Sequence, residues 1–341
     1  MITNIFLQEL YRDILSEHRC FCAFPMDKER FYLKNISKID PSDCDNFTSE
    51  FKTGIEDYSK AFLLEDFNLE NNVEVIAVTD MICNALSKKR FEMYQVVVFS
   101  GLFTMMSHRL IVEQMVNKIC NYCKTHRMDD AEKHVEELLK LSYCLEFWIY
   151  FGKSKSNIKN IALILNKGDR QNYLHALGGA MLFIYLHEVG HIELNHHSLS
   201  FCLSKDEAES IEHAADEFVI NLVKPNLRPT MLVNALLVFE MINDFELFAL
   251  KSRNGHPLVY RRIENLKNLV EKNCNDDLLS VVGQQISKSR LRHQNSRFCN
   301  EINGNSSLDE TKRKDDFEEQ LPPVEDCEKG FNILCNLYMK M

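Results

Sequence analysis

The chain has 341 residues, of which 45% are apolar and 26% charged, and its formal net charge is −10. These proportions are typical of a globular protein with a hydrophobic core, and they exclude a disordered or low-complexity chain. The negative charge argues against nucleic acid as a partner, because proteins that bind nucleic acid usually present an excess of lysine and arginine.

Cellular location is inferred from the first residues and from the cysteines. The opening stretch MITNIFLQELYRDILSEH has the charge pattern of an amphipathic helix, unlike that of a signal peptide. Twelve cysteines are scattered through apolar stretches, which favours reduced thiols over a disulfide framework. No apolar stretch reaches the roughly 18 residues that a transmembrane helix requires. We therefore expect a cytoplasmic protein with no membrane partner.

The predicted secondary structure is mainly helical. Two stretches rich in β-branched residues, 72–78 and 94–99, predict strands. Apolar residues at helical spacing, with only 11 glycines and 7 prolines, predict helices over most of the remaining chain. In chain order, these helices are expected at residues 1–18, 104–123, 129–151, 173–197, 206–223, 229–248 and 258–272. The expected fold class is thus mainly α, of the α+β type, with one small sheet.

Composition also predicts the loops and the domain organisation. DPSDCDN at residues 40–46 is interpreted as a loop, and the basic SKKR at residues 87–90 as a solvated loop. A polar, charged segment near the C-terminus predicts a mobile linker, followed by a tail that is apolar enough to pack on the body. The expected organisation is an N-terminal mixed region at 1–70, a main domain at 71–287, the linker at 288–327 and the tail at 328–341.

An HExxH motif, the stretch HEVGH at residues 187–191, carries the functional prediction. On a helix, His187 and His191 are one turn apart and face the same side, so both imidazoles can bind one metal ion. Glu188 then lies beside the ion and can accept a proton from a water molecule, as in zinc hydrolases. The alternative interpretation is a helix end with solvated histidines.

The third protein ligand decides the class of zinc enzyme. His197 follows His187 at the spacing of the HExxHxxGxxH enzymes, but Leu194 replaces the glycine at which the chain turns in that motif. A helix that continues through Leu194 points His197 away from the ion. We therefore reject that scheme.

The next predicted helix offers a carboxylate as the third ligand. Its segment AESIEHAADEFVI contains Glu212 and, one turn later on the same face, Asp216. We predict that Glu212 binds the ion and that Asp216 accepts a hydrogen bond from a histidine ligand. The alternatives are Glu209, which also lies near that face, and Glu207 and Glu217, which suit a solvated face. The choice between Glu212 and Glu209 stays open.

A third segment, GHPLVYRRIENL, follows further along the chain. His256 lies in a loop before Pro257, which can open a helix. His256 can donate a hydrogen bond to the oxyanion of a tetrahedral intermediate, and Arg262 can anchor either Asp216 or the wall of the active site. The alternative interpretation is a loop histidine and a surface arginine.

A second candidate metal site is weaker. Cys120 and Cys123 have the spacing of one of the two ligand pairs that a structural zinc site requires, and His126 and His134 lie nearby in the sequence. A second close pair of cysteines does not follow, so we interpret this segment as a helix end.

The segments HEVGHIELNHH, EHAADEFV and GHPLVYRRI, in this order, resemble the gluzincin-type peptidases and, among these, the phage-exclusion peptidase Lit family. The matching motifs lie within residues 180–266. The resemblance implies a helical zincin-like core that binds Zn²⁺ and uses a glutamate as general base. The matching positions are His187, His191 and Glu212 for the ligands, Glu188 for the base and His256 for a transition-state donor.

The resemblance also implies a biological role. The Lit family is associated with cleavage of elongation factor Tu during phage infection, so we expect a zinc endopeptidase that acts in phage defence by cleaving a host protein such as a translation factor. Two alternatives remain: an ImmA-like regulatory peptidase that cuts a repressor, and a non-catalytic binding protein that uses zinc as a scaffold. Glu188 argues against the scaffold, because an inactive site has no need of that carboxylate.

Overall fold

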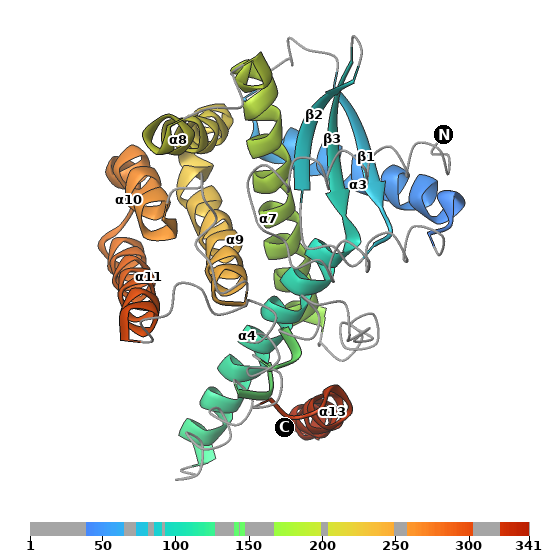
Figure 1. Ribbon diagram of the computed structural model, residues 1–341. Helices are drawn as coiled ribbons and strands as arrows, with labels where there is room; N and C mark the ends of the chain where they lie inside the picture. Colours follow the sequence, from blue (N-terminus) through green and yellow to red (C-terminus); the bar gives the residue numbers. More distant parts are fainter. Residues whose placement is uncertain are drawn as a thin grey trace. The chain divides into compact units, whose positions relative to one another are not determined.

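The computed structural model describes several stretches of the chain, which are mostly helical with three strands in one small sheet (Figure 1). The described stretches are residues 39–64, 73–80, 85–90, 93–126, 140–142, 144–146, 167–198, 204–248, 258–302 and 321–340. The predicted mainly α, α+β fold is confirmed. The described elements group into two compact units, and each unit is considered by itself.

The first unit contains the sheet and the helices around it. Its strands are β1 (Val73–Val78), β2 (Ala85–Arg90) and β3 (Met93–Phe99). Its helices are α3 (Pro41–Phe62), the part of α7 (Lys167–Glu193) from Gly178 onward, η1 (His196–Ser198), α8 (Lys205–Leu222), η2 (Pro225–Leu227), α9 (Arg228–Phe248), α10 (Val259–Val270), η3 (Glu271–Asn273) and α11 (Asp276–Ile302).

The sheet has the strand order β1-β3-β2. β3 pairs parallel with β1, where Val75 is opposite Val96, and antiparallel with β2, where Ser87 is opposite Val96. The central strand carries an uninterrupted buried run from Val96 to Phe99, as expected of a strand with a neighbour on each side. The two strands predicted at 72–78 and 94–99 are confirmed by β1 and β3.

β2 is a strand where the sequence predicted a solvated loop at residues 87–90, so that prediction is wrong. Lysine and arginine have low strand propensity, and they conceal the strand in the sequence. The strand order explains their presence, because β2 is at the edge of the sheet and has one neighbour. Charged side chains are common on edge strands, where they discourage uncontrolled pairing with other chains.

Helix α3 starts where the sequence predicted a loop at residues 40–46, and this prediction is also wrong. The side chain of Asp40 accepts a 2.8 Å hydrogen bond from the backbone N–H of Ser42 and caps the helix, and Pro41 occupies its first turn. Aspartate followed by proline is therefore a helix-start signal here, since proline is tolerated at the first helical position.

The same helix covers the outer edge of β1. The hydroxyl of Thr48 accepts a 2.8 Å hydrogen bond from the backbone N–H of Ala77 and donates a 3.2 Å hydrogen bond to the Ala77 carbonyl. Both backbone groups point away from β3, and without Thr48 they would be available to another strand. One edge of the sheet, formed by β1, is therefore covered by α3 at Ala77, and the other edge is formed by β2.

The C-terminal part of α7 lies between the sheet and the helices α8 to α10 (Figure 1). On one side, the ring of Tyr185 meets Phe51 of α3 with centroids 6.4 Å apart, and on the other, Phe183 meets Phe239 of α9 at 5.7 Å. Apolar residues from Ala180 to Leu186 are all buried, and this burial positions the motif that follows them.

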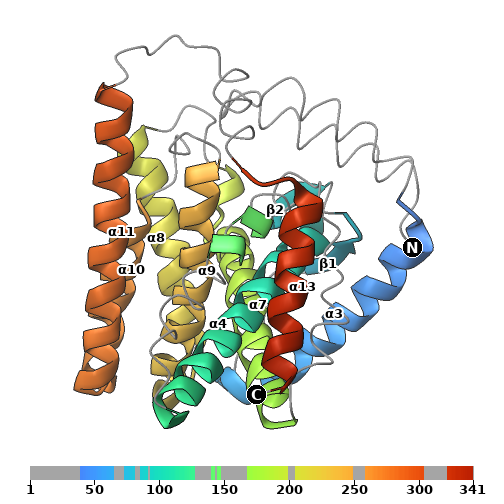
Figure 2. The ribbon, with the colours of Figure 1, turned by 90° about the horizontal axis from the view of Figure 1, so that it is seen from below.

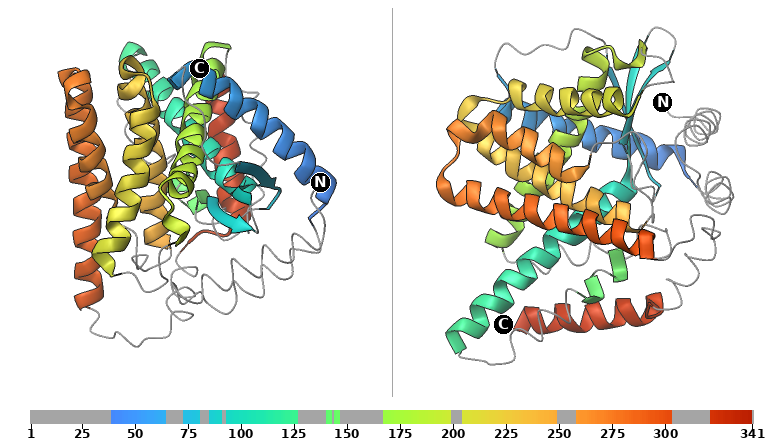
Figure 3. Two further views of the ribbon diagram at one scale, coloured as in Figure 1. Left: turned by 90° about the horizontal axis from the view of Figure 1, so that it is seen from above. Right: turned by 60° about the vertical axis from the view of Figure 1, so that its left-hand side comes forward.

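Helices α8 to α11 form a packed group (yellow to orange-red in Figure 3), in which α10 contacts α8, α9 and α11. α10 is amphipathic, and its buried face includes one charged residue, Arg262. α11 continues to Ile302, so residues 288–302, which the sequence placed in a polar linker, are helical. Residues 303–320 are outside the described part of the chain.

The second unit contains α4 (Ser100–His126), the first part of α7 up to Leu177, and α13 (Val324–Lys340). α13 packs against α4 (Figure 2), with the ring of Phe331 5.0 Å from that of His108. His108 is also hydrogen-bonded through Nε2 to the hydroxyl of Ser142, at 3.0 Å. Among the described residues, no helix is long and apolar enough to cross a membrane.

Candidate metal centre

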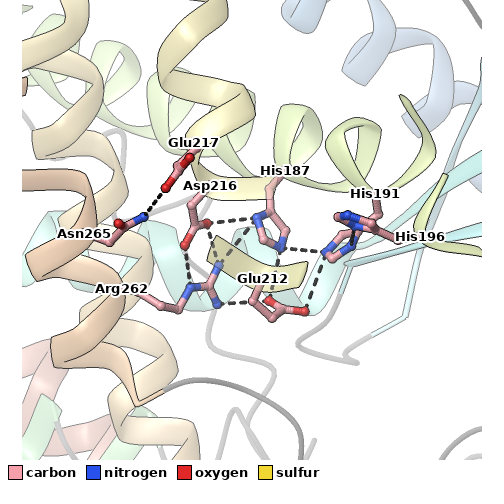
Figure 4. A network of polar contacts seen from close by, with 8 residues as sticks. All are labelled: His187, His191, His196, Glu212, Asp216, Glu217, Arg262 and Asn265. Atoms are coloured by element: carbon pink, nitrogen blue, oxygen red, sulfur yellow. Dashed lines mark hydrogen bonds and ion pairs between the residues drawn. The ribbon is translucent and has the colours of Figure 1, made fainter. Parts of the chain in front are cut away.

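Three side chains from two helices converge in the first unit (Figure 4). His187 and His191 are one turn apart on α7, and their Nε2 atoms are 3.1 Å from each other. Glu212 comes from α8, with one carboxylate oxygen 3.4 Å from Nε2 of His187 and the other 3.6 Å from Nε2 of His191. The structure thus brings together the three residues predicted as metal ligands.

The distances among these donor atoms suit a small cation. Zinc bound to nitrogen and oxygen at roughly 2.0–2.1 Å in tetrahedral geometry places neighbouring donors about 3.3 Å apart. The three separations, 3.1, 3.4 and 3.6 Å, lie close to that value. Two imidazoles and a carboxylate are also the ligand types that zinc prefers in hydrolases, so the residues present fit such an ion.

Gly190 allows α8 to approach α7 at this point. A side-chain Cβ at Gly190 would lie 3.1 Å from Cδ1 of Phe218 and 3.3 Å from the backbone of Ala215, closer than nearly all such contacts in proteins. The absence of a side chain within the HExxH motif therefore lets the two helices cross closely enough for the Glu212 carboxylate to reach both histidines.

Asp216 and Arg262 hold the first histidine from behind. Nδ1 of His187 is 2.9 Å from a carboxylate oxygen of Asp216. Arg262, from α10, donates hydrogen bonds of 2.8 and 2.7 Å to the two oxygens of Asp216. Asp216 is fully buried and Arg262 is 5% exposed, so this ion pair is shielded from solvent. The contact between Asp216 and Arg262 that the sequence suggested is present.

The electrostatics of the cluster favour a positive charge at His187. Burial by itself would lower the pKa of His187, but its hydrogen bonds to Asp216 and Glu212 outweigh burial and raise the pKa to about 10. Burial lowers the pKa of His191 to about 3, so this ring is neutral. Burial would likewise raise the pKa of Asp216, but Arg262 keeps that pKa below its usual value. The site thus stabilises one cationic charge between two carboxylates, which a metal ion can supply in place of a proton.

Glu188 lies next to the first histidine and contacts the edge of the sheet. It accepts hydrogen bonds from the side chain and the backbone of Ser87 on β2. Desolvation raises the pKa of Glu188, although the neighbouring His187 acts in the opposite direction. A carboxylate with a raised pKa is a stronger proton acceptor, as a general base requires. The sequence did not identify Ser87, because the strand that carries it was interpreted as a loop.

The alternative carboxylates of α8 have other partners. Glu207 forms a capping box with Ser204, and its carboxylate accepts a 2.8 Å hydrogen bond from the Ser204 backbone. Glu209 pairs with Arg261 at 2.9 Å, and Glu217 accepts a 3.0 Å hydrogen bond from Asn265. Among the described residues, the group able to hold a metal ion is His187, His191 and Glu212.

The remaining predicted site residues fall outside what the structure describes. His256 and Pro257 lie outside the described residues, as does His134. The side chains of Cys120, Cys123 and His126, on the last turns of α4, are also not described. The roles predicted for these residues therefore stay predictions.

The end of α7 differs from the sequence prediction. The helix was expected to continue to His197, but it ends at Glu193, and Asn195 adopts a positive φ of 56°. The chain then turns, which brings Nδ1 of His196 to 2.9 Å from Nδ1 of His191. His197 lies against Tyr94 of β3, with ring centroids 6.1 Å apart. An asparagine, which tolerates this backbone conformation, was the signal for the turn.

Comparison with known proteins assigns the chain to a family. The family model described as peptidase U49 matches residues 111–282, just over half of the chain, a span that includes the HExxH helix, Glu212 and Arg262. Searches of curated proteins and of solved structures found no significant match. The chain therefore belongs to the peptidase U49 family, and it is on that ground a protease.

Proposed function

We propose that this peptidase is a zinc-dependent endopeptidase that hydrolyses a peptide bond within a protein substrate. The observation that carries the proposal is the convergence of His187, His191 and Glu212 at separations that suit tetrahedral zinc, with Glu188 on the adjacent position of the same helix. This combination supplies both a ligand set and a base, which a structural zinc site does not need.

The chemistry divides between the ion and the side chains. A bound Zn²⁺ supplies Lewis acidity, which polarises a substrate carbonyl and makes a water molecule more acidic. Glu188 accepts the proton of the attacking water and returns it to the leaving amine, for which its raised pKa is suited. Asp216 accepts a hydrogen bond from the Nδ1–H of His187 and thereby keeps Nε2 available as a ligand.

β2 is the proposed site for an extended substrate segment. An edge strand can pair with a peptide through backbone hydrogen bonds, which bind without regard to most side chains. The backbone of Ser87 already bonds to Glu188, so a peptide that paired with the neighbouring residues of β2 would pass beside the general base. This arrangement supports cleavage within a chain in preference to removal of terminal residues.

The proposed biological role is phage defence through cleavage of a host protein, with elongation factor Tu as the first candidate substrate. This role rests on the resemblance of three sequence segments to the Lit family. The expected cytoplasmic location and the net charge of −10 agree with a protein partner, and no nucleic acid is proposed to take part.

The test combines metal content with cleavage. The wild type and the Glu188→Gln variant are each loaded with zinc, and the bound zinc is quantified by mass spectrometry. Each protein is then incubated with purified elongation factor Tu and with cytosolic extract. We expect equal zinc in both proteins and new cleavage sites with the wild type alone. Glu240→Gln on α9, a partly buried glutamate that is not among the predicted site residues, is the matched control and should cleave as the wild type does. Zinc retained by both proteins without any cleavage would contradict the proposal and favour a scaffold.

A further inference from the structure

His196 contacts the second histidine on the side away from the proposed ion. Its Nδ1 atom is 2.9 Å from Nδ1 of His191, and the two ring centroids are 5.1 Å apart in an edge-to-face arrangement (Figure 4). The other nitrogen of His191, Nε2, points toward His187 and Glu212. The two nitrogens of His191 therefore face different partners.

We infer that His196 is a positioning residue, which holds His191 in the tautomer and orientation needed to bind the metal. The inference rests on the proposed metal site. A histidine that binds a metal through Nε2 carries its proton on Nδ1, and this N–H usually donates to a nearby acceptor. At 2.9 Å that acceptor is Nδ1 of His196, which must then carry its own proton on Nε2.

The turn that follows α7 brings His196 into contact with His191. The backbone N–H of Leu194 still bonds to the carbonyl of Gly190 at 3.0 Å, and that of Asn195 bonds to the carbonyl of Ile192 at 2.9 Å. Asn195 then adopts the left-handed conformation, with φ of 56°, and reverses the chain. The reversal directs His196 back along the helix toward His191, where a continuing helix would have carried it away.

The two histidine ligands are thus supported in different ways. His187 contacts the carboxylate of Asp216, whose charge is balanced by Arg262. His191 contacts an imidazole, which orients the ring without adding a charge. The direct ligands would be two imidazoles and one carboxylate, and a contact of His191 with an imidazole adds no further negative charge beside the ion.

A role for His196 as a metal ligand fits the geometry less well. The atom of His196 that approaches the cluster is Nδ1, and it faces the outer nitrogen of His191. The group of donor atoms within 4.8 Å of one another consists of His187, His191 and Glu212. His196 therefore acts through His191 and does not touch the ion in this arrangement.

The experiment measures zinc affinity by competition with a chromophoric chelator, in the full-length protein. His196→Ala removes the acceptor, and His196→Asn keeps an acceptor oxygen close to the position of Nδ1. His197→Ala is the matched control, because it changes the next residue of the same turn, which packs on Tyr94 instead. We expect zinc binding to weaken about 10- to 100-fold in His196→Ala, with most of the loss restored in His196→Asn and none in His197→Ala.

A spectroscopic measurement on the wild type complements the variants. In zinc-loaded protein labelled with ¹⁵N-histidine, we expect His191 to carry its proton on Nδ1 and His196 on Nε2. The inference is overturned if His196→Ala binds zinc as tightly as the wild type, if His196→Asn is as weak as His196→Ala, or if His196 is protonated at Nδ1.

The failure of this inference can be told apart from failure of the proposed function. Glu212→Gln serves as the reference, because it removes a direct ligand. If the wild type and Glu212→Gln both bind no zinc, the metal site itself is wrong, and the inference falls with it. If Glu212→Gln loses zinc while His196→Ala keeps it, only the role of His196 is wrong.

Discussion

Arg262 and Asp216 form a buried ion pair that joins α10 to α8 directly behind the candidate metal centre. Two guanidinium nitrogens, Nε and Nη2, lie 2.8 and 2.7 Å from the two carboxylate oxygens. The guanidinium carbon is also 4.7 Å from the centre of the Phe239 ring, a cation–π contact that favours the buried position of the charge. The arginine thus makes it possible to bury the charge of the carboxylate that supports His187.

Replacement of this arginine should destabilise the fold strongly. Arg262→Met leaves the Asp216 carboxylate buried without its partner, which typically costs about 3–5 kcal/mol in the free energy of unfolding. Arg290→Met is the control, because Arg290 and its partner Glu264 have side chains that are 50% and 37% exposed, and the loss of this pair should cost about 1 kcal/mol or less. Urea unfolding of both variants measures the difference. Similar losses in the free energy of unfolding for the two variants would show that burial does not determine the contribution of the Arg262–Asp216 pair.

The third ligand can be identified by two isosteric changes. Glu212→Gln should abolish tight zinc binding, because the carboxylate that lies within 3.6 Å of both histidines loses its charge. Glu209→Gln should keep it, because Glu209 pairs with Arg261. Isothermal titration with zinc gives both affinities. The opposite result would make Glu209 the ligand.

Gly190 should be sensitive to the smallest possible side chain. In Gly190→Ala, the new methyl group meets the backbone of Ala215 at 3.3 Å, so α8 must move by a few tenths of an ångström and carry Glu212 with it. We expect zinc affinity to fall about tenfold, as for other disturbances of the groups that support a ligand. Gly283→Ala on α11 is the control: nothing lies within 4 Å of its new methyl group, so the protein should become slightly more stable. Unchanged zinc affinity in Gly190→Ala would contradict a role for the close crossing.

His108 should make the second unit sensitive to acid. Burial lowers the pKa of His108 to about 4, below the usual value of 6.5. The unfolded chain therefore binds more protons than the folded one between these values, and stability falls as the pH is lowered from 6.5 toward 4, by up to about 1.4 kcal/mol per pH unit. Denaturant unfolding at several pH values, compared between the wild type and His108→Gln, isolates this contribution. Parallel curves for the two proteins would show that His108 titrates normally.

Some elements could be predicted from the sequence because their signals are local. The helical spacing of apolar residues located α7 to α10, and the HExxH motif placed His187 and His191 on one face of a single helix. Two β-branched runs located β1 and β3. In each case the pattern reflects contacts that the element makes with the core through one face.

Other features could not be predicted because they depend on distant partners. β2 reads as a basic loop, and only its pairing with β3 makes it a strand. Glu209 and Glu212 are three residues apart on nearly the same face of α8, so periodicity cannot choose between them, and the choice depends on where α10 places Arg261. The contact between His196 and His191 depends on a backbone reversal at one asparagine.

The hydroxyl of Thr48 gives the sheet a preferred side for capture of an extended chain. Because it occupies both outward backbone groups of Ala77, a foreign segment that approaches β1 finds these two groups already paired. The opposite edge of the sheet is formed by β2, whose Ser87 contacts Glu188. If substrate binds as an added strand, as proposed, this asymmetry would favour β2, the edge that contacts the general base, through the backbone alone and before any side chain is recognised.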